Sequence, residues 1–202
     1  MEWKDISIRQ YQDLCKEIDE EYPDELSRSI GLLSSLTGET ISHYTDEMPI
    51  NKLKVELKGL EFIKKPAPKY KLHSVIRVGK KRFRFNLNMR SISAGQYIDL
   101  TEFVKDNDKI NDNLHTILAT VCEEVNWFGI KKKTETLDRA KYLQDNLKMP
   151  YVFTLSSFFL SNYQRLIKGT NDFLESEMKK MRKKTREVVD RALSDIGDGI
   201  IH

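Results

Sequence analysis

The chain reads SIRQYQDL at residues 7–14 and SAGQYIDL at residues 93–100, and these two stretches decide the fold. Both follow the pattern S-x-x-Q-Y-x-D-L. A serine followed three residues later by glutamine is typical of a capping box, in which each side chain binds the backbone N–H of the other residue at a helix start. Residues three apart lie on one helix face. The pattern therefore predicts two capped amphipathic helices whose tyrosine and leucine face inward.

Each stretch is followed by a similar order of elements. A second apolar helix is expected at residues 30–36 in one half and at residues 117–121 in the other, and a Met-Pro pair then precedes a further helix at residues 48–49 and 149–150. One interpretation is a duplicated helical unit. The alternative is that S-x-x-Q merely caps helices and that Tyr and Leu three residues apart are routine core positions.

Between the two halves the periodicity changes from that of a helix to that of a strand. Residues 73–78 and 82–87 alternate polar with apolar side chains around Gly79-Lys80, which predicts one β-hairpin. On the second strand Phe83 and Phe85 share one face, while Arg82 and Arg84 share the other. Because an isolated two-stranded ribbon is marginal in water, it must pack on the helices or on a neighbouring chain.

The C-terminal part carries a single apolar line from Thr154 to Ile196 at steps of three and four residues. This predicts a long helix of roughly 60 Å. A body of about 150 residues is only about 30 to 40 Å across, so part of the line is expected to pack on another chain. The predicted oligomer interface consists of Leu174, Met178, Met181 and Val189 of this helix, together with Phe83 and Phe85.

The expected fold class is mainly α, a multi-helix bundle with one β-hairpin and a long C-terminal helix. Four parts are expected along the chain: an N-terminal helical unit at 1–68, the hairpin at 69–90, a second helical unit at 91–150 and the oligomerising helix at 151–202.

A basic run lies within the predicted C-terminal helix and forms a candidate contact surface. It could neutralise the phosphates of nucleic acid, although the run has no aromatic residues for base stacking. It could equally be the solvated face of an amphipathic helix, or bind an acidic groove on a partner protein. Its members are Lys179, Lys180, Arg182, Lys183, Lys184 and Arg186.

Composition and motifs argue against catalysis. The 34 basic and 31 acidic residues leave a net charge of only +3, so charge alone favours neither nucleic acid nor membrane. No histidine or cysteine has the spacing of a metal site, and no nucleophile elbow or phosphate-binding loop occurs. Glu123 and Glu124, adjacent on a predicted helix, would point apart. We therefore expect no catalytic, metal or cofactor site, and reduced structural thiols at Cys15 and Cys122.

The N-terminus has no apolar core of a signal peptide, and no segment has the apolar length of a membrane span. The sequence therefore predicts a protein that stays in the cytoplasm where it is made and has no membrane partner.

Three features together carry a resemblance to a known group of proteins: WKDIS followed by QY at residues 3–11, SAGQYIDL just after a basic hairpin, and a C-terminal helix that runs from Phe158-Phe159 to the KKM of residues 179–181. They resemble small proteins encoded in the tail-gene region of tailed bacteriophages, including crAss-like phages of Bacteroidetes hosts. Members of such gene neighbourhoods are virion components of the tail or head-to-tail connector, or tail assembly chaperones. The resemblance brings no catalytic residues with it.

The resemblance implies a virion structural protein that assembles as a homo-oligomeric ring. The defined caps, a hairpin able to add to a neighbour's sheet and the lack of a long disordered tail favour this role over a tail assembly chaperone. Its expected partners are other phage tail or connector proteins, with DNA contact through the basic run. It would occupy the host cytoplasm during assembly and then the virion. A nucleic-acid-binding accessory protein is the remaining alternative.

Overall fold

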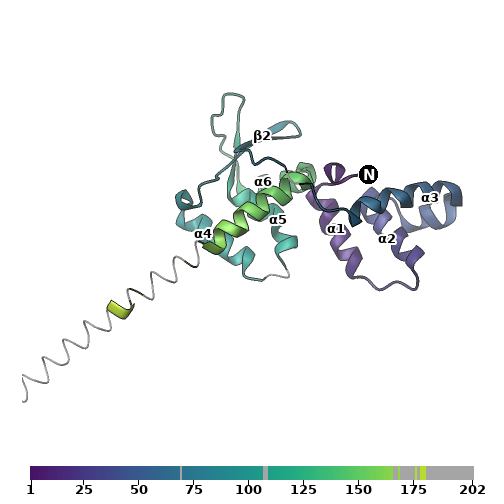
Figure 1. Cartoon of the computed structure of the whole chain (residues 1–202). Helices are drawn as coiled ribbons and strands as arrows, with labels where there is room; N and C mark the ends of the chain where they lie inside the picture. The colour runs from purple at the N-terminus through teal and green to yellow at the C-terminus, as the bar shows by residue number, and fades with distance from the viewer. Residues whose placement is uncertain (69, 107–108, 166–167, 169–175, 177, 181–202) are drawn as a thin grey trace, which may run out of the picture. The chain divides into compact units, whose positions relative to one another are not determined.

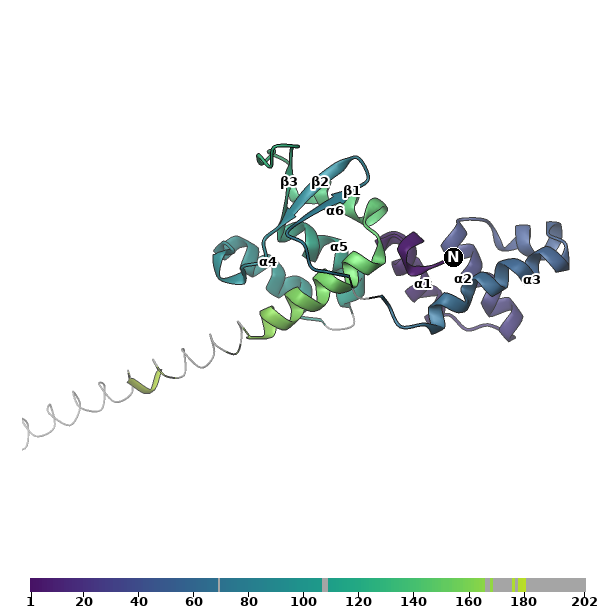
Figure 2. The ribbon, with the colours of Figure 1, turned by 45° about the horizontal axis from the view of Figure 1, so that its top comes forward.

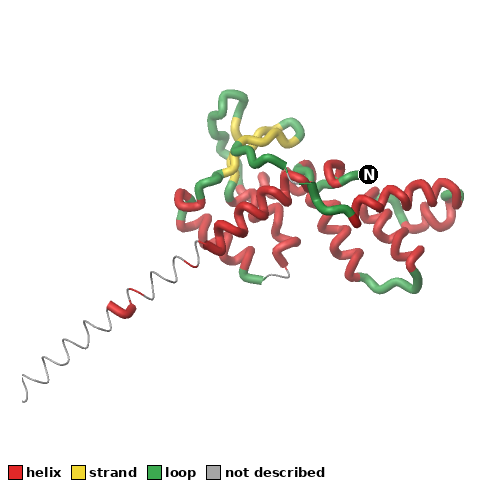
Figure 3. Tube along the Cα trace, in the orientation of Figure 1, coloured by secondary structure: helices red, strands yellow, loops and turns green. Residues whose placement is uncertain are grey.

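The structure, a computed structural model, describes residues 1–68, 70–106, 109–165, 168, 176 and 178–180 of the chain (Figure 1). The chain divides into a compact unit of residues 1–159 and a second unit of residues 160–202. Within the described residues the protein is mainly helical with one small antiparallel sheet (Figure 3), which confirms the predicted fold class.

Helices make up most of the first unit. Short 3₁₀ segments lie at Trp3–Asp5, Gly59–Lys64 and Met89–Ser91, and one π-helical turn lies at His43–Glu47. Helical residues continue over 149–165, and residues 168, 176 and 178–180 are helical as well. The labelled α-helices are α1 (Ile8–Asp19), α2 (Glu25–Thr37), α3 (Ile50–Lys58), α4 (Ala94–Val104), α5 (Ile110–Thr120) and α6 (Thr136–Asn146).

Both S-x-x-Q patterns form the predicted capping boxes. Gln10 Oε1 accepts a hydrogen bond from Ser7 N at 3.0 Å, and Ser7 Oγ accepts from Gln10 N at 3.3 Å. Gln96 Oε1 accepts from Ser93 N at 3.0 Å, and Ser93 Oγ accepts from Gln96 N at 3.2 Å. Two backbone donors that a helix start leaves unpaired are thereby satisfied at each position, which explains why α1 and α4 begin there.

The same two glutamines also make a second bond that capping does not require. Gln10 Nε2 donates to Leu36 O at the end of α2 at 2.7 Å, and Gln96 Nε2 donates to Thr120 O at the end of α5 at 2.7 Å. Each glutamine thus joins the start of its own helix to the end of the next helix. The two helix pairs share this link as well as their sequence pattern.

The apolar members of the two patterns differ in burial. Leu14 and Leu100 are buried, as predicted. Tyr11 and Tyr97 are only half-buried. The leucines therefore contribute to the interior of their helix pairs, whereas the tyrosines lie at its boundary.

The sheet contains one strand more than the sequence predicted. Strands β1 (Val75–Val78) and β2 (Lys81–Phe85) form the expected hairpin, and β3 (Cys122–Val125) pairs antiparallel with β2 (Figure 2). The predicted helix through Val121 and Cys122 is wrong at its end, because α5 stops at Thr120 and the chain extends into β3. One edge of the hairpin, that of β2, is therefore paired with a strand of the same chain.

Helix α6 packs on the inner face of the hairpin through Tyr142. Its ring lies 5.8 Å from that of Phe83, centroid to centroid, and Lys81 Nζ lies 4.6 Å from the centre of the tyrosine ring. The Tyr142 hydroxyl accepts from Lys80 N and donates to Val78 O, both at 3.2 Å. This single side chain holds both ends of the hairpin turn against the helices.

Candidate functional site

The chain makes a tight turn directly after β3. Gly129 N donates to Asn126 O at 3.0 Å, Asn126 N donates to Ile130 O at 2.9 Å, and the Asn126 side-chain oxygen accepts from Ile130 N at 2.8 Å. Gly129 has a φ of 78°, a left-handed conformation that favours glycine. A bridge between Val125 and Lys131 closes the turn. The backbone of this turn is thus fixed by its own hydrogen bonds.

Three large hydrophobic side chains project from this turn into solvent. Trp127, Phe128 and Ile130 are 73%, 84% and 64% exposed. We call residues 127–130 the WFGI loop. Burying a side chain of this size stabilises a fold or a complex by about 1.5 to 3 kcal/mol. A partner that covered these three side chains would therefore gain substantial binding free energy. Aromatic side chains on a pre-ordered backbone are typical of interface hot spots, because little conformational entropy is lost when they bind.

Two arginines of β2 hold the WFGI loop over the outer face of the sheet. The Arg82 guanidinium lies 4.1 Å from the centre of the Trp127 ring and donates to Trp127 O at 3.4 Å. Arg84 Nη2 donates to Gly129 O at 2.9 Å. The predicted alternation of β2 is confirmed, since Phe83 and Phe85 are buried on the opposite face.

The loop lies beside basic residues of the sheet and is followed by three lysines. Residues 75–85 and 122–133 contain eight basic residues and two acidic ones. Arg77 lies directly opposite Arg82 in the register of β1 and β2, and like charges so placed repel each other. Lys81 and Lys132 lie on the opposite face of the sheet, where they pair with the buried Glu124. We call the outer face the basic sheet surface; its basic members are Arg77, Arg82, Arg84 and Lys131, together with the exposed Lys133.

The two acidic residues of β3 are already engaged. Glu123 forms an ion pair with Lys131. Glu124 is buried and pairs with Lys81 and Lys132, each at 3.0 Å. Burial by itself would raise the pKa of Glu124, but the hydrogen bonds and charges of the two lysines outweigh it and lower the pKa. Glu123 and Glu124 thus lie on a strand rather than the predicted helix, and Glu124 serves a structural role.

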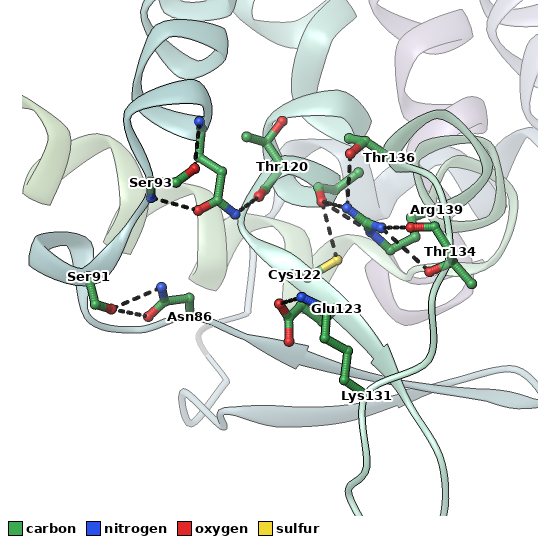
Figure 4. A network of polar contacts seen from close by, with 12 residues as sticks. Asn86, Ser91, Ser93, Thr120, Cys122, Glu123, Lys131, Thr134, Thr136 and Arg139 are labelled. Carbon is green, nitrogen blue, oxygen red and sulfur yellow. Dashed lines mark hydrogen bonds and ion pairs between the residues drawn. The ribbon is translucent and has the colours of Figure 1, made fainter.

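The junction between α5 and β3 fixes where the loop emerges. Gln96 binds Thr120 O, and Arg139 of α6 donates to Ala119 O at 3.4 Å from Nε and at 3.2 Å from Nη2 (Figure 4). Arg139 also donates to Thr134 O and, at 3.0 Å, to the Thr136 hydroxyl. A cation at the carbonyl end of a helix is favourable for the helix dipole. These bonds end α5 and hold the segment that returns from the WFGI loop to α6.

Both cysteines are free thiols, as the sequence predicted. Cys122 is fully buried at the start of β3 beside this junction, and burial raises its pKa to about 12. Cys15 is half-buried, and burial raises its pKa as well. Raised pKa values keep both thiols protonated, which suits structural thiols and not nucleophiles.

The sequence-predicted interface residues fall into three groups. Phe83 and Phe85 are 0% and 1% exposed, so intramolecular packing covers both side chains and leaves no area of them for another subunit. Met178 is 49% exposed, and Lys179 and Lys180 are exposed and helical. The other predicted contact residues lie outside the described residues: Leu174, Met181, Arg182, Lys183, Lys184, Arg186 and Val189.

No family model, curated protein or solved structure matches this chain.

Within the part of the chain that the structure describes, no group of three or more histidine, cysteine, aspartate or glutamate side chains is placed to hold a metal ion. The helices described there are all too short or too polar to cross a bilayer. His115 is half-buried within α5, and its Nδ1 lies 3.2 Å from Gln12 Nε2.

Trp127, Phe128 and Gly129 were not singled out as a binding segment from the sequence alone. The sequence did contain a signal for a binding loop. In Trp-Phe-Gly-Ile followed by three lysines, the glycine favours a turn, the aromatic residues are typical of interface hot spots, and the lysines add positive charge. What the sequence did not contain was the proximity of Arg82 and Arg84, which are 45 residues away along the chain.

Proposed function

We propose that this protein is a non-enzymatic structural subunit of the tail or head-to-tail connector of a tailed bacteriophage, and that it assembles as a ring by binding neighbouring subunits. The phage context rests on the sequence resemblance. The binding role rests on the WFGI loop.

The main support for the binding role is that the WFGI loop is both exposed to solvent and held in one conformation. A water-exposed hydrophobic side chain on a mobile segment needs little explanation, because single exposed apolar residues are common. Trp127, Phe128 and Ile130 instead project together from a turn that its own hydrogen bonds and two arginines fix in place. Trp and Arg are the residue types most enriched in protein interface hot spots.

Removing the aromatic side chains tests the proposal. The double variant Trp127→Ala/Phe128→Ala should lose self-association or partner binding, as followed by light scattering of the eluting protein, and keep its helical circular dichroism. The matched control is Ile50→Ala/Val55→Ala on α3, which removes two other exposed hydrophobic side chains, 56% and 67% exposed. Equal association of the loop variant and the wild type would remove the main support for a binding role.

A second candidate function is nucleic-acid binding, favoured by the position of Arg82 and Arg84 beside exposed aromatic side chains. Cationic surfaces with aromatic platforms bind single strands in a salt-sensitive way. Filter binding of an oligothymidylate at low and high salt separates this function from subunit assembly. Mass spectrometry of purified particles separates a virion subunit, present in stoichiometric amount, from a tail assembly chaperone that leaves the finished particle.

A further inference from the structure

The connection between α1 and α2 forms an acidic corner, which we define as residues 19–25. Five of its seven residues are acidic, and all five are exposed. Four of them line a surface hollow of about 460 Å³ together with Tyr22 and Arg28. None of the ion pairs found among the described residues includes these carboxylates, which are Glu20, Glu21, Asp24 and Glu25. The corner therefore presents a concave surface on which four carboxylates outnumber the single basic side chain, that of Arg28.

Hydrophobic side chains flank this corner. Ile18 precedes it and is 39% exposed, and Leu26 follows it and is 50% exposed. Tyr22 lies half-buried in the hollow and donates a hydrogen bond to Glu17. The acidic corner is thus a hollow lined mainly by carboxylates, with an exposed apolar side chain next to each of its ends in the chain. The WFGI loop combines exposed apolar side chains with neighbouring arginines and so has the opposite charge.

These two surfaces belong to different elements and lie apart in the unit of residues 1–159 (Figures 1 and 2). One follows β3 at the sheet, and the other joins α1 to α2. A contact between them must therefore join two copies of the chain. Because two different patches would meet, the contact is heterologous, and repeated contacts of this kind close into a ring or continue as a filament.

We infer that the WFGI loop and basic sheet surface of one copy dock on the acidic corner of the next copy. The inference rests on the proposed assembly function and specifies which surfaces meet. Charge complementarity steers the encounter and excludes like-charged approaches. The apolar loop tip packs against Tyr22 and the flanking Ile18 and Leu26. Arg77 and Arg82, which repel each other in the free chain, gain carboxylate partners.

A protein partner fits the loop better than a nucleic acid does. Arg82 covers one face of the Trp127 ring, which leaves only the other face of that ring for a base to stack on. Ile130 is aliphatic and offers no stacking surface, but it fits an apolar rim. Each surface is small, so a single contact is expected to be weak, on the order of micromolar.

Charge exchange between the two surfaces tests this inference. The loop variant Lys131→Glu/Lys133→Glu and the corner variant Glu20→Lys/Glu21→Lys each place like charges across the contact. Sedimentation velocity of each variant alone should show association weakened roughly tenfold or more relative to the wild type. A mixture of the two variants should associate again, because each altered surface then meets its complement. A variant that merely misfolds cannot be rescued by mixing.

Two further measurements control the experiment. The matched variant Lys52→Glu/Lys54→Glu changes the same number of charges on exposed residues of α3 and should associate like the wild type. The fluorescence emission of Trp127 should shift with protein concentration in the wild type. That shift should be absent in Trp127→Phe, in which Trp3 is the remaining tryptophan.

The outcomes separate this inference from the proposed function. Association that survives both charge reversals, or reversals that mixing does not rescue, overturns the head-to-tail contact and leaves the assembly function standing. A wild-type chain that stays monomeric at high concentration overturns both. Monomeric protein that binds oligothymidylate with a change in Trp127 emission assigns the loop to nucleic acid instead.

Discussion

Replacing Gln10 by glutamate separates the two bonds that this side chain makes. Gln10 Oε1 accepts from Ser7 N at the start of α1, and Gln10 Nε2 donates to Leu36 O at the end of α2. Glutamate retains the acceptor, and S-x-x-E is itself a favourable capping box. Glutamate has no side-chain N–H, however, so the hydrogen bond to Leu36 O is lost. Capping alone therefore predicts an unchanged or stabilised protein, whereas the cross-helix bond predicts a loss of stability.

The expected loss follows from the geometry. The bond to Leu36 O is short, at 2.7 Å, and one such hydrogen bond contributes about 1 kcal/mol net. The new carboxylate gains about 0.3 to 1 kcal/mol at the N-terminus of α1 and loses a similar amount beside the carbonyl end of α2, so these two effects cancel. Gln10→Glu should therefore lower the free energy of unfolding by about 1 kcal/mol, and Gln10→Ala, which loses both bonds, by about 2 kcal/mol.

Urea denaturation at neutral pH, followed by far-ultraviolet circular dichroism, measures both values. A decrease of about 1 kcal/mol corresponds to a melting temperature about 2 to 4 °C lower in a chain of this size. Asn51→Asp is a matched control, because it makes the same amide-to-acid change on an exposed residue in the first turn of α3. If Gln10→Glu proves as stable as the wild type, the bond to Leu36 contributes nothing and the cap explains the pattern alone.

Three further variants test the site and its support. Gly129→Ala should destabilise the protein by about 1 to 2 kcal/mol in urea denaturation, because φ is +78° and the added Cβ would lie 2.9 Å from Arg84 Nη2; an unchanged midpoint would contradict the assigned turn. Arg139→Met should lose about 2 kcal/mol by the same measurement, since it removes the donors to Ala119 O, and full stability would show that α5 ends there without them. Because burial raises the pKa of Cys122 to about 12, the folded state keeps its proton above pH 9, where the unfolded thiol ionises. The Cys122 thiol therefore leaves the free energy of unfolding unchanged below about pH 9 and lowers it by about 1.4 kcal/mol per pH unit above that. Denaturation series across this pH range should show that Cys122→Ala lacks this contribution.

Local sequence was sufficient where one segment contains its own structural signal. A capping box spans four residues, so Ser7 with Gln10 and Ser93 with Gln96 located two helix starts without knowledge of the rest. The alternation around Gly79 likewise located a hairpin and assigned the inward and outward faces of β2. The side chains involved are neighbours along the chain, and their geometry follows from the period of the element.

Tertiary structure decided what depends on partners distant in the sequence. The apolar period of α5 continues through Val121 and Cys122, yet the chain leaves the helix there, because bonds from Gln96 and Arg139 satisfy its last carbonyls and β2 offers a pairing edge to residues 122–125. Arg82 and Arg84 also reach the WFGI loop only because β3 pairs with β2. Pairing with β2 depends on contacts about 40 residues apart, and no local period encodes them. The sequence by itself thus determined the helices, their caps and the hairpin, and only the packed chain determined the third strand and the surface that it presents.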